Sequence, residues 1–164
     1  MCGIAGIIHR GKSSNVGSEM TSMLVALKHR GPDSSGFAVY GEPKSGEYLM
    51  RIKVAEQEDM DKGRGATTLI RDRICQIDEI LTEHNVEVKE KENITAYALR
   101  YVISHNGDVQ AMAQHIEEVE GVEILSLGSC LELVKDLGDA TIVSEQYGLS
   151  NFRGTHAIGH TRMA

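Results

Sequence analysis

The sequence of 164 residues has little proline, little cysteine, no excess of basic residues and no long apolar run. Two prolines, 25% charged residues and 41% hydrophobic residues argue against disorder and indicate one or two globular units. A net charge of −7 leaves no basic excess to neutralise phosphates, so we expect no nucleic-acid partner. No apolar run reaches the roughly 18 residues of a membrane span. The N-terminus also lacks the basic region of a signal peptide, so we expect no membrane partner.

The cysteines and histidines do not form a recognisable metal or disulfide pattern. Cys2, Cys75 and Cys130 are odd in number and widely spaced, which excludes a disulfide framework and a zinc ligand set. The seven histidines are scattered without metal-ligand spacing. The Gly63-Arg64-Gly65 segment lacks the lysine and hydroxyl residue of a phosphate loop. We therefore expect no metal, no cofactor and a location in the reducing cytoplasm.

The composition changes twice along the chain, which predicts a domain with an insertion. Residues 1–54 are rich in glycine with short apolar runs, and this character returns over 136–164. Residues 55–135 follow a different order of elements, which predicts a small inserted α/β subdomain of ferredoxin-like type. The fold class expected for the whole chain is α+β.

Periodicity predicts the elements of the outer domain. Residues 3–8 form a buried strand, and residues 16–29 form an amphipathic helix with Ser18 as its N-cap and Gly31-Pro32 as its stop. Strands are predicted over 35–41 and 46–54, joined as a hairpin by the EPKS linker. A final apolar strand begins at His156.

The insertion alternates between helical and extended patterns. The predicted order is helix, strand, strand, helix, strand and helix, over 67–84, 85–92, 93–104, 109–119, 122–128 and 129–137. The first helix carries an isoleucine and leucine stripe, and Cys75 is expected in the core on that stripe. A structural role is also expected for Cys130, which follows a Gly-Ser turn.

Cys2 is the residue that suggests chemistry. Removal of Met1 would free its α-amine, which titrates at about pH 7.7–8.0 and could act as a base for the thiol of the same residue. Position alone leaves a second reading open, in which Cys2 is a small residue at a frayed terminus.

Three ordered motifs decide between these readings. They are CGIAGI at 2–7, HRGPDSSG at 29–36 and GHTR at 159–162. Together they resemble the class II glutamine amidotransferases, a family of N-terminal-nucleophile (Ntn) hydrolases that begin with cysteine. The residues of the second and third motifs are similar to those in the amidotransferase subunits of archaeal-type glutamate synthases. The resemblance covers residues 1–54 and 136–164. It implies the N-terminal part of an αββα sandwich.

The resemblance also implies an activity and residue roles. Cys2 would hydrolyse L-glutamine to glutamate and ammonia through a thioester, and the ammonia would pass to a synthase partner, glutamate synthase by this resemblance. Arg162 matches the family arginine that holds the glutamine α-carboxylate, in a bidentate fork that suits guanidinium. Arg30 matches an arginine that orders the nucleophile segment. Structural roles are expected for Asp33 and His160.

Parts of the family pattern are not matched. The family oxyanion hole is an Asn-Gly pair that follows the arginine strand, whereas this sequence stops at Ala164. Asn106-Gly107 has the same two residue types but precedes that strand in the chain. Because Asn-Gly is also common in turns, we expect this pair to form a turn. Met163 stands where some members carry an aromatic residue. We therefore expect an N-terminal fragment that is inactive alone, with its oxyanion donors beyond Ala164.

Two alternatives remain from the sequence. The chain could be a catalytically inactive regulatory or assembly module that keeps the amidotransferase fold. It could also be another acyl hydrolase with an N-terminal cysteine, although the GHTR strand argues against this because it suits an amino-acid carboxylate. The acceptor of the ammonia and the role of the insertion do not follow from the residues.

Overall fold

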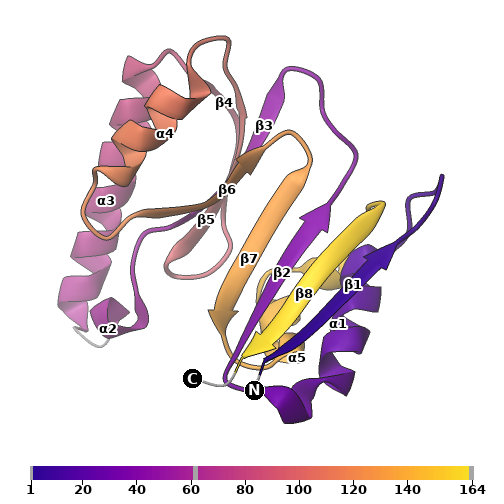
Figure 1. Ribbon diagram of the computed structural model, residues 1–164. Coiled ribbons are helices and arrows are strands. Elements are labelled where there is room, and N and C mark those ends of the chain that lie inside the picture. The colour runs from indigo at the N-terminus through magenta and orange to yellow at the C-terminus, as the bar shows by residue number, and fades with distance from the viewer. Residues whose placement is uncertain (1, 61–62, 163–164) are drawn as a thin grey trace. The chain divides into compact units, whose positions relative to one another are not determined.

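The computed structural model describes residues 2–60 and 63–162 and divides the chain into two compact units (Figure 1). Unit 1 comprises residues 1–43 and 130–164, and unit 2 comprises residues 44–129. Both are mixed α+β, each with a four-stranded sheet whose paired strands are all antiparallel. Within the described residues, no helix has the length and apolar character that a membrane crossing requires.

Unit 1 combines the two ends of the chain in one sheet. Its elements are β1 (Gly3–Ile8), α1 (Val16–Ala26), η1 (Lys28–Arg30), β2 (Ser34–Tyr40), β7 (Leu131–Leu137), α5 (Ala140–Gln146), η2 (Leu149–Asn151) and β8 (His156–Arg162). The strands lie in the order β1-β8-β2-β7. The final strand β8 therefore lies between the first two strands of the chain, and it brings the GHTR motif beside both N-terminal motifs.

The two faces of this sheet differ in cover. Along β8, Ala157 and Thr161 are buried at 1% and 2% exposure, whereas Ile158 between them is 51% exposed. The covered face packs on α1, where a Cβ built on Gly159 would lie 2.8 Å from the Leu24 side chain. The other face, which we call the open face, presents Ile4 and Ile158 to solvent. Alternation along the strands assigns every second residue to it.

Unit 2 has the strand and helix order βαββαβ, if the single turn of α2 is set aside. Its elements are β3 (Glu47–Lys53), α2 (Gln57–Met60), α3 (Arg64–Glu83), β4 (Glu87–Asn93), β5 (Ala98–Ser104), α4 (Val109–Glu117) and β6 (Glu123–Gly128). The sheet order is β4-β5-β3-β6. This is the strand and helix order of the ferredoxin-like folds. It includes β3, which the sequence assigned to the outer domain and not to the insertion.

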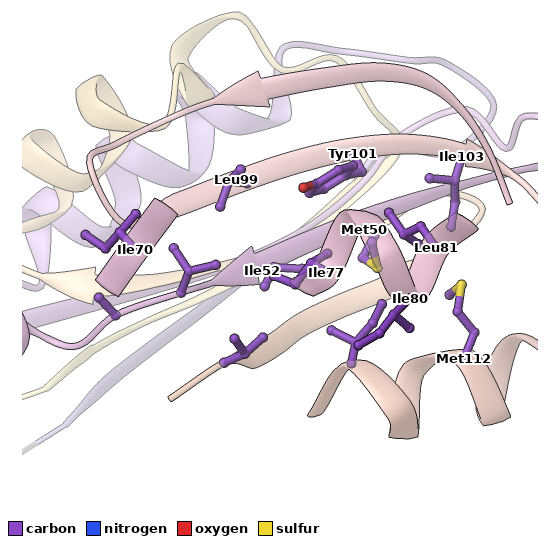
Figure 2. Close-up of a cluster of buried hydrophobic side chains, with 14 residues drawn as sticks. Met50, Ile52, Ile70, Ile77, Ile80, Leu81, Leu99, Tyr101, Ile103 and Met112 are labelled. Carbon is purple, nitrogen blue, oxygen red and sulfur yellow. The ribbon is translucent and has the colours of Figure 1, made fainter. Parts of the chain in front are cut away.

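The core of unit 2 lies between its sheet and the helices α3 and α4 (Figure 2). It is dominated by branched side chains that are almost fully removed from water, including Ile52, Ile77, Leu81, Ile103 and Ile116. Tyr101 is also fully buried, and its hydroxyl donates to Asp78 Oδ1 at 3.1 Å. Burial together with this carboxylate raises the pKa of Tyr101. At the sheet edge, by contrast, all seven residues of β4 are exposed.

Five local predictions are wrong. Residues 3–8 form strand β1, but it is not a buried strand, because α1 covers one face of the sheet and Ile4 and Ile8 lie on the other. A helix was predicted over 129–137, but residues 131–137 form strand β7. The residue pattern fits a helix and a strand equally well, and pairing with β2 selects the strand. β2 and β3 do not form a hairpin: β2 pairs with β7 and β8, and β3 pairs with β5 and β6. The side chain of Asn15, not Ser18, caps α1 by accepting from the Ser18 N–H at 3.3 Å. Cys75 is exposed, because the buried stripe runs through Ile70, Ile77 and Leu81 and leaves Cys75 to one side.

Candidate functional site

The three motifs meet at one end of the unit 1 sheet. Gly3 pairs with Thr161, and Ser34 pairs with Arg162. Cys2 precedes Gly3 and Arg162 follows Thr161, so the antiparallel register, carried one residue further, places Cys2 level with Arg162. Figure 1 shows the start of β1 and the tip of β8 at the same end of the sheet.

Both residues belong to the open face. Ile4 is 74% exposed and Ile158 is 51% exposed, so the residues in phase with them point away from α1. Arg162 is in phase with Ile158 and is exposed, and Cys2 is in phase with Ile4 and carries a free, exposed thiol. The structure thus brings the predicted nucleophile and the predicted carboxylate-binding arginine to one end of one face.

The glycine after Cys2 is required by close packing. A Cβ built on Gly3 would lie 2.9 Å from Thr161 Oγ1 and 3.1 Å from Leu27 Cβ. Any larger residue would push the start of β1 away from β8 and from the end of α1. Gly3 therefore holds Cys2 close to the strand that carries Arg162.

The next residue pair along the open face contains His160. It pairs with Gly36, and a Cβ on Gly36 would lie 2.4 Å from His160 Nε2, so the imidazole lies over the glycine. Partial burial, together with the positive charges of Lys135 and Arg162, holds the pKa of His160 below its ordinary value of 6.5. The lowered pKa leaves the His160 imidazole neutral near pH 7, on the same strand as Arg162 and two residues before it.

Arg30 and Asp33 lie on the turn that reaches the same end. Arg30 is the last residue of η1 and is exposed, and its N–H donates to Leu27 O at 2.8 Å. The N–H of Asp33 donates to Arg162 O at 3.1 Å, and the Asp33 carbonyl accepts from the Gly138 N–H at 2.9 Å. The backbone of Asp33 thereby ties this turn to the ends of β8 and β7.

A charged pair holds the same turn from the other side. Lys28 Nζ in η1 lies 2.7 Å from Asp139 Oδ2, and Asp139 caps α5 by accepting from the N–H groups of Thr141 and Ile142. The lysine and the backbone donors of the cap hold the pKa of Asp139 below its ordinary value. The segment that carries Arg30 is therefore fixed to both β8 and α5.

Other candidate residues lie elsewhere. Cys75 and the Asn106-Gly107 pair belong to unit 2, and Gly107 packs against the ring of His105, 2.7 Å from a Cβ built on it. Cys130 is partly buried before β7, where its carbonyl accepts from the Gly41 N–H. Met163 lies outside the described residues. Within the described chain, no group of three or more His, Cys, Asp or Glu side chains is placed to hold a metal ion.

Lys135 and the hollow beside it were not predicted from the sequence. Lys135 pairs with Gly36 and so lies in the same row as His160. The open face there forms a mainly apolar hollow of about 330 Å³, lined by Ile4, Ala38, Leu133, Lys135, Ile158 and His160, among others. The alternation of Leu131, Leu133 and Leu137 is the period-two signal that could have identified this strand.

Comparison with known proteins gives the chemical context of this geometry. Searched against protein-family models, the chain matches none. It is 32% identical over its whole length to a protein of Methanothermobacter thermautotrophicus named "Putative glutamine amidotransferase". The chain is similar to glutamine amidotransferases. It is also 28% identical over its whole length to the "Glutamine amidotransferase-like protein GlxB" of Rhizobium meliloti.

The matched relatives differ in how much of each chain the similarity covers. The chain covers 52% of the first protein and 50% of the second, so it spans about half the length of these curated relatives. A third match, to a glutamine-hydrolyzing "Putative asparagine synthetase" of Methanocaldococcus jannaschii, is 38% identical over 63 residues, or 38% of this chain. All three printed names refer to glutamine chemistry.

Proposed function

We propose that this chain is the N-terminal part of a class II glutamine amidotransferase, in which Cys2 hydrolyses L-glutamine and the ammonia passes to a synthase partner. The partner proposed is a glutamate synthase, from the similarity of the motifs. The observation that carries the proposal is the register of β1 and β8, which sets Cys2 level with Arg162 at one end of the open face. A nucleophile and a carboxylate-binding cation in this relation suit an amino-acid amide.

The proposed reaction uses both functional groups of Cys2. After removal of Met1, the α-amine accepts the thiol proton and the thiolate attacks the side-chain amide carbon of glutamine. The C–N bond breaks, the amine returns the proton to the leaving nitrogen, and ammonia departs from a thioester. Water then adds to the thioester carbon, which releases glutamate and restores the thiol.

Two arginines have different proposed roles. Arg162 binds the α-carboxylate, since guanidinium offers two parallel donors to two oxygens. Arg30 acts as a positioning residue on a turn that is fixed by the Asp33 to Arg162 hydrogen bond and the Lys28 to Asp139 pair. In this proposal residues 1–54 and 136–164 are the amidotransferase domain and residues 55–135 are the insertion. The two compact units of the structure have their boundaries nearby, between residues 43 and 44 and between residues 129 and 130.

The two faces of the unit 1 sheet support an αββα sandwich. α1 and α5 lie on the covered face, while the open face carries Ile4, Ile8 and Ile158 at 74%, 77% and 51% exposure. Exposed apolar side chains in phase on three positions of two paired strands suit the inner surface of a two-sheet core. The candidate site lies at the end of that surface.

The test is covalent labelling of the gene product at its full length. Diazo-oxo-norleucine, an electrophilic glutamine analogue, should label Cys2 alone, and Cys2→Ser should abolish both labelling and ammonia release. Cys75→Ser and Cys130→Ser are matched controls that should keep both. Intact mass should show that the active protein lacks Met1. Label on Cys75 or Cys130, or full activity with Met1 retained, would overturn the proposal, and a folded protein with neither labelling nor activity would favour the inactive module.

A further inference from the structure

Two histidines of unit 2 face each other across its helix pair. His84 Nε2 and His115 Nδ1 are 3.3 Å apart, with ring centroids 5.5 Å apart and ring planes at 64°. His84 is the C-cap residue of α3, and His115 lies in the last turn of α4. They are 31 residues apart in the sequence, so only the fold brings the two nitrogens together.

The separation is long for a direct hydrogen bond and also fits a shared metal ion. N–H···O hydrogen bonds in proteins span about 2.7–3.2 Å, and the imidazole–imidazole contact at 3.3 Å lies just beyond that range. Two imidazole nitrogens that each lie about 2.0–2.1 Å from one tetrahedral Zn²⁺ are about 3.3–3.4 Å apart. The observed spacing therefore matches the distance between two ligands on one zinc ion.

The helix backbones hold this spacing through the core beneath it. Ile80 and Leu81 of α3 and Met112 and Ile116 of α4 are at most 7% exposed. Figure 2 shows Ile80, Leu81 and Met112 together where the two helices meet the sheet. Because packed neighbours fix both helices, the two ligands are positioned before any ion arrives, which favours binding.

The surroundings are acidic, which favours a dication electrostatically. A surface hollow of about 360 Å³ beside His115 is lined by four carboxylate residues, Glu79, Glu83, Glu118 and Glu120. Glu118 is exposed and follows His115 by three residues, which places it on the same side of α4. Since no third protein ligand is in place among the described residues, water or a rotated carboxylate would complete the coordination.

We propose that His84 and His115 bind one divalent transition-metal ion of the Zn²⁺ type, which joins the C-terminal ends of α3 and α4. Imidazole nitrogen is a preferred ligand of Zn²⁺, Ni²⁺ and Cu²⁺. The site lies within unit 2 and does not depend on the glutaminase proposal. It differs from the sequence-based expectation of no metal, because two single histidines without a short spacing give no motif.

The experiment is a titration of the tag-free chain with zinc chloride, followed by calorimetry. One Zn²⁺ per chain is expected. Loss of an outer partner of a metal ligand costs about 10–100-fold in affinity, so removing a ligand itself should cost at least about 100-fold in His84→Ala or His115→Ala. His29→Gln removes an exposed histidine of unit 1 and should bind Zn²⁺ like the unmodified chain.

Two further readouts keep the result independent of folding. Circular dichroism should show that both alanine variants remain folded, and Zn²⁺ should raise the melting temperature of the unmodified chain but not of either variant. Cu²⁺ added in place of Zn²⁺ should show two coupled nitrogens in its electron paramagnetic resonance spectrum. Absence of saturable Zn²⁺ binding, or equal binding by the folded His84→Ala and His115→Ala variants, would overturn the proposal.

Discussion

Unit 1 and unit 2 each place helices against one face of a four-stranded antiparallel sheet, but they do so with different residues. In unit 1 a Cβ on Gly159 would lie 2.8 Å from the side chains of Leu24 and Met20, so the α1 contact requires glycine. In unit 2 the same kind of contact is filled by branched side chains such as Ile52 and Ile77, both fully buried. Close approach constrains residue identity in unit 1, whereas burial in unit 2 constrains mainly size. Three of the closely packed glycines, Gly3, Gly36 and Gly159, lie within the motifs of unit 1.

The sharpest test of this difference replaces one arginine in each unit. Arg162→Ala should lower kcat/KM for glutamine about 30-fold to several thousandfold, since loss of a charge-assisted pair costs about 2–5 kcal/mol. Arg162→Lys should recover only part, because an ammonium cannot form the fork. Arg71→Ala, at an exposed arginine of α3, is the control and should leave kcat/KM unchanged. Steady-state ammonia release by the full-length gene product measures all three, and a change below about threefold for Arg162→Ala would contradict the carboxylate role.

The next test asks whether unit 2 demands size alone. Ile77 is fully buried in its core, so Ile77→Ala should lower the free energy of unfolding by about 2–5 kcal/mol. Ile77→Leu keeps the volume and should cost less than about 1.5 kcal/mol. Urea denaturation of the two variants measures the difference. Equal losses would show that shape, and not size, is constrained at this position.

One helix glycine in each unit allows a direct comparison of how tightly the two units pack around their helices. A Cβ on Gly17 of α1 would lie 1.8 Å from the Leu149 carbonyl oxygen, so Gly17→Ala should cost about 1–3 kcal/mol or more through overpacking. A Cβ on Gly65 of α3 would meet nothing within 4 Å, so Gly65→Ala should raise stability by up to about 1 kcal/mol through helix propensity. Thermal and urea unfolding should therefore shift in opposite directions. A loss of stability in Gly65→Ala would remove the contrast.

The smallest expected effect concerns pH and the open face. The pKa of His160 is lowered in the folded chain, so the unfolded chain binds more protons between that pKa and the ordinary value of 6.5. Stability should therefore fall as the pH drops below about 6.5, and His160→Gln should lose this part of the acid dependence. Unfolding free energies measured from pH 7.5 to 5 give the comparison. Identical pH profiles for both proteins would exclude a contribution from His160.

The same contrast explains what the sequence could and could not predict. The 20-residue helix α3 and strand β8 were predictable because their apolar periods are strong and each partner face is simple. Strand β7 was not predictable, because its sequence LELVKDL fits a helix as well as a strand. Its pairing partner β2 also lies about a hundred residues earlier in the chain. The same long-range pairing replaced the predicted hairpin of β2 and β3.

Part of the proposed site was visible in local motifs. Cys2 and Arg162 each lie in a short motif, so the sequence indicated them before their strands were known to pair. Lys135 was not predicted because the pattern of its segment also fits a helix, and the pair His84 and His115 was not predicted because nothing local in the sequence relates the two residues. Residues whose roles arise only from tertiary register leave no local pattern.

Strand β4 has a consequence for how concentrated samples of this chain behave. As an edge strand with seven exposed residues, among them Lys89, Glu90 and Lys91, it opposes pairing with a second chain, because charged side chains on an edge, lysine above all, disfavour edge-to-edge association. Strand β1 is also an edge, but its sequence GIAGII has no charge, and Ile4 and Ile8 are exposed. Self-association should therefore begin at β1, so solubility of the chain depends on the six residues that directly follow Cys2.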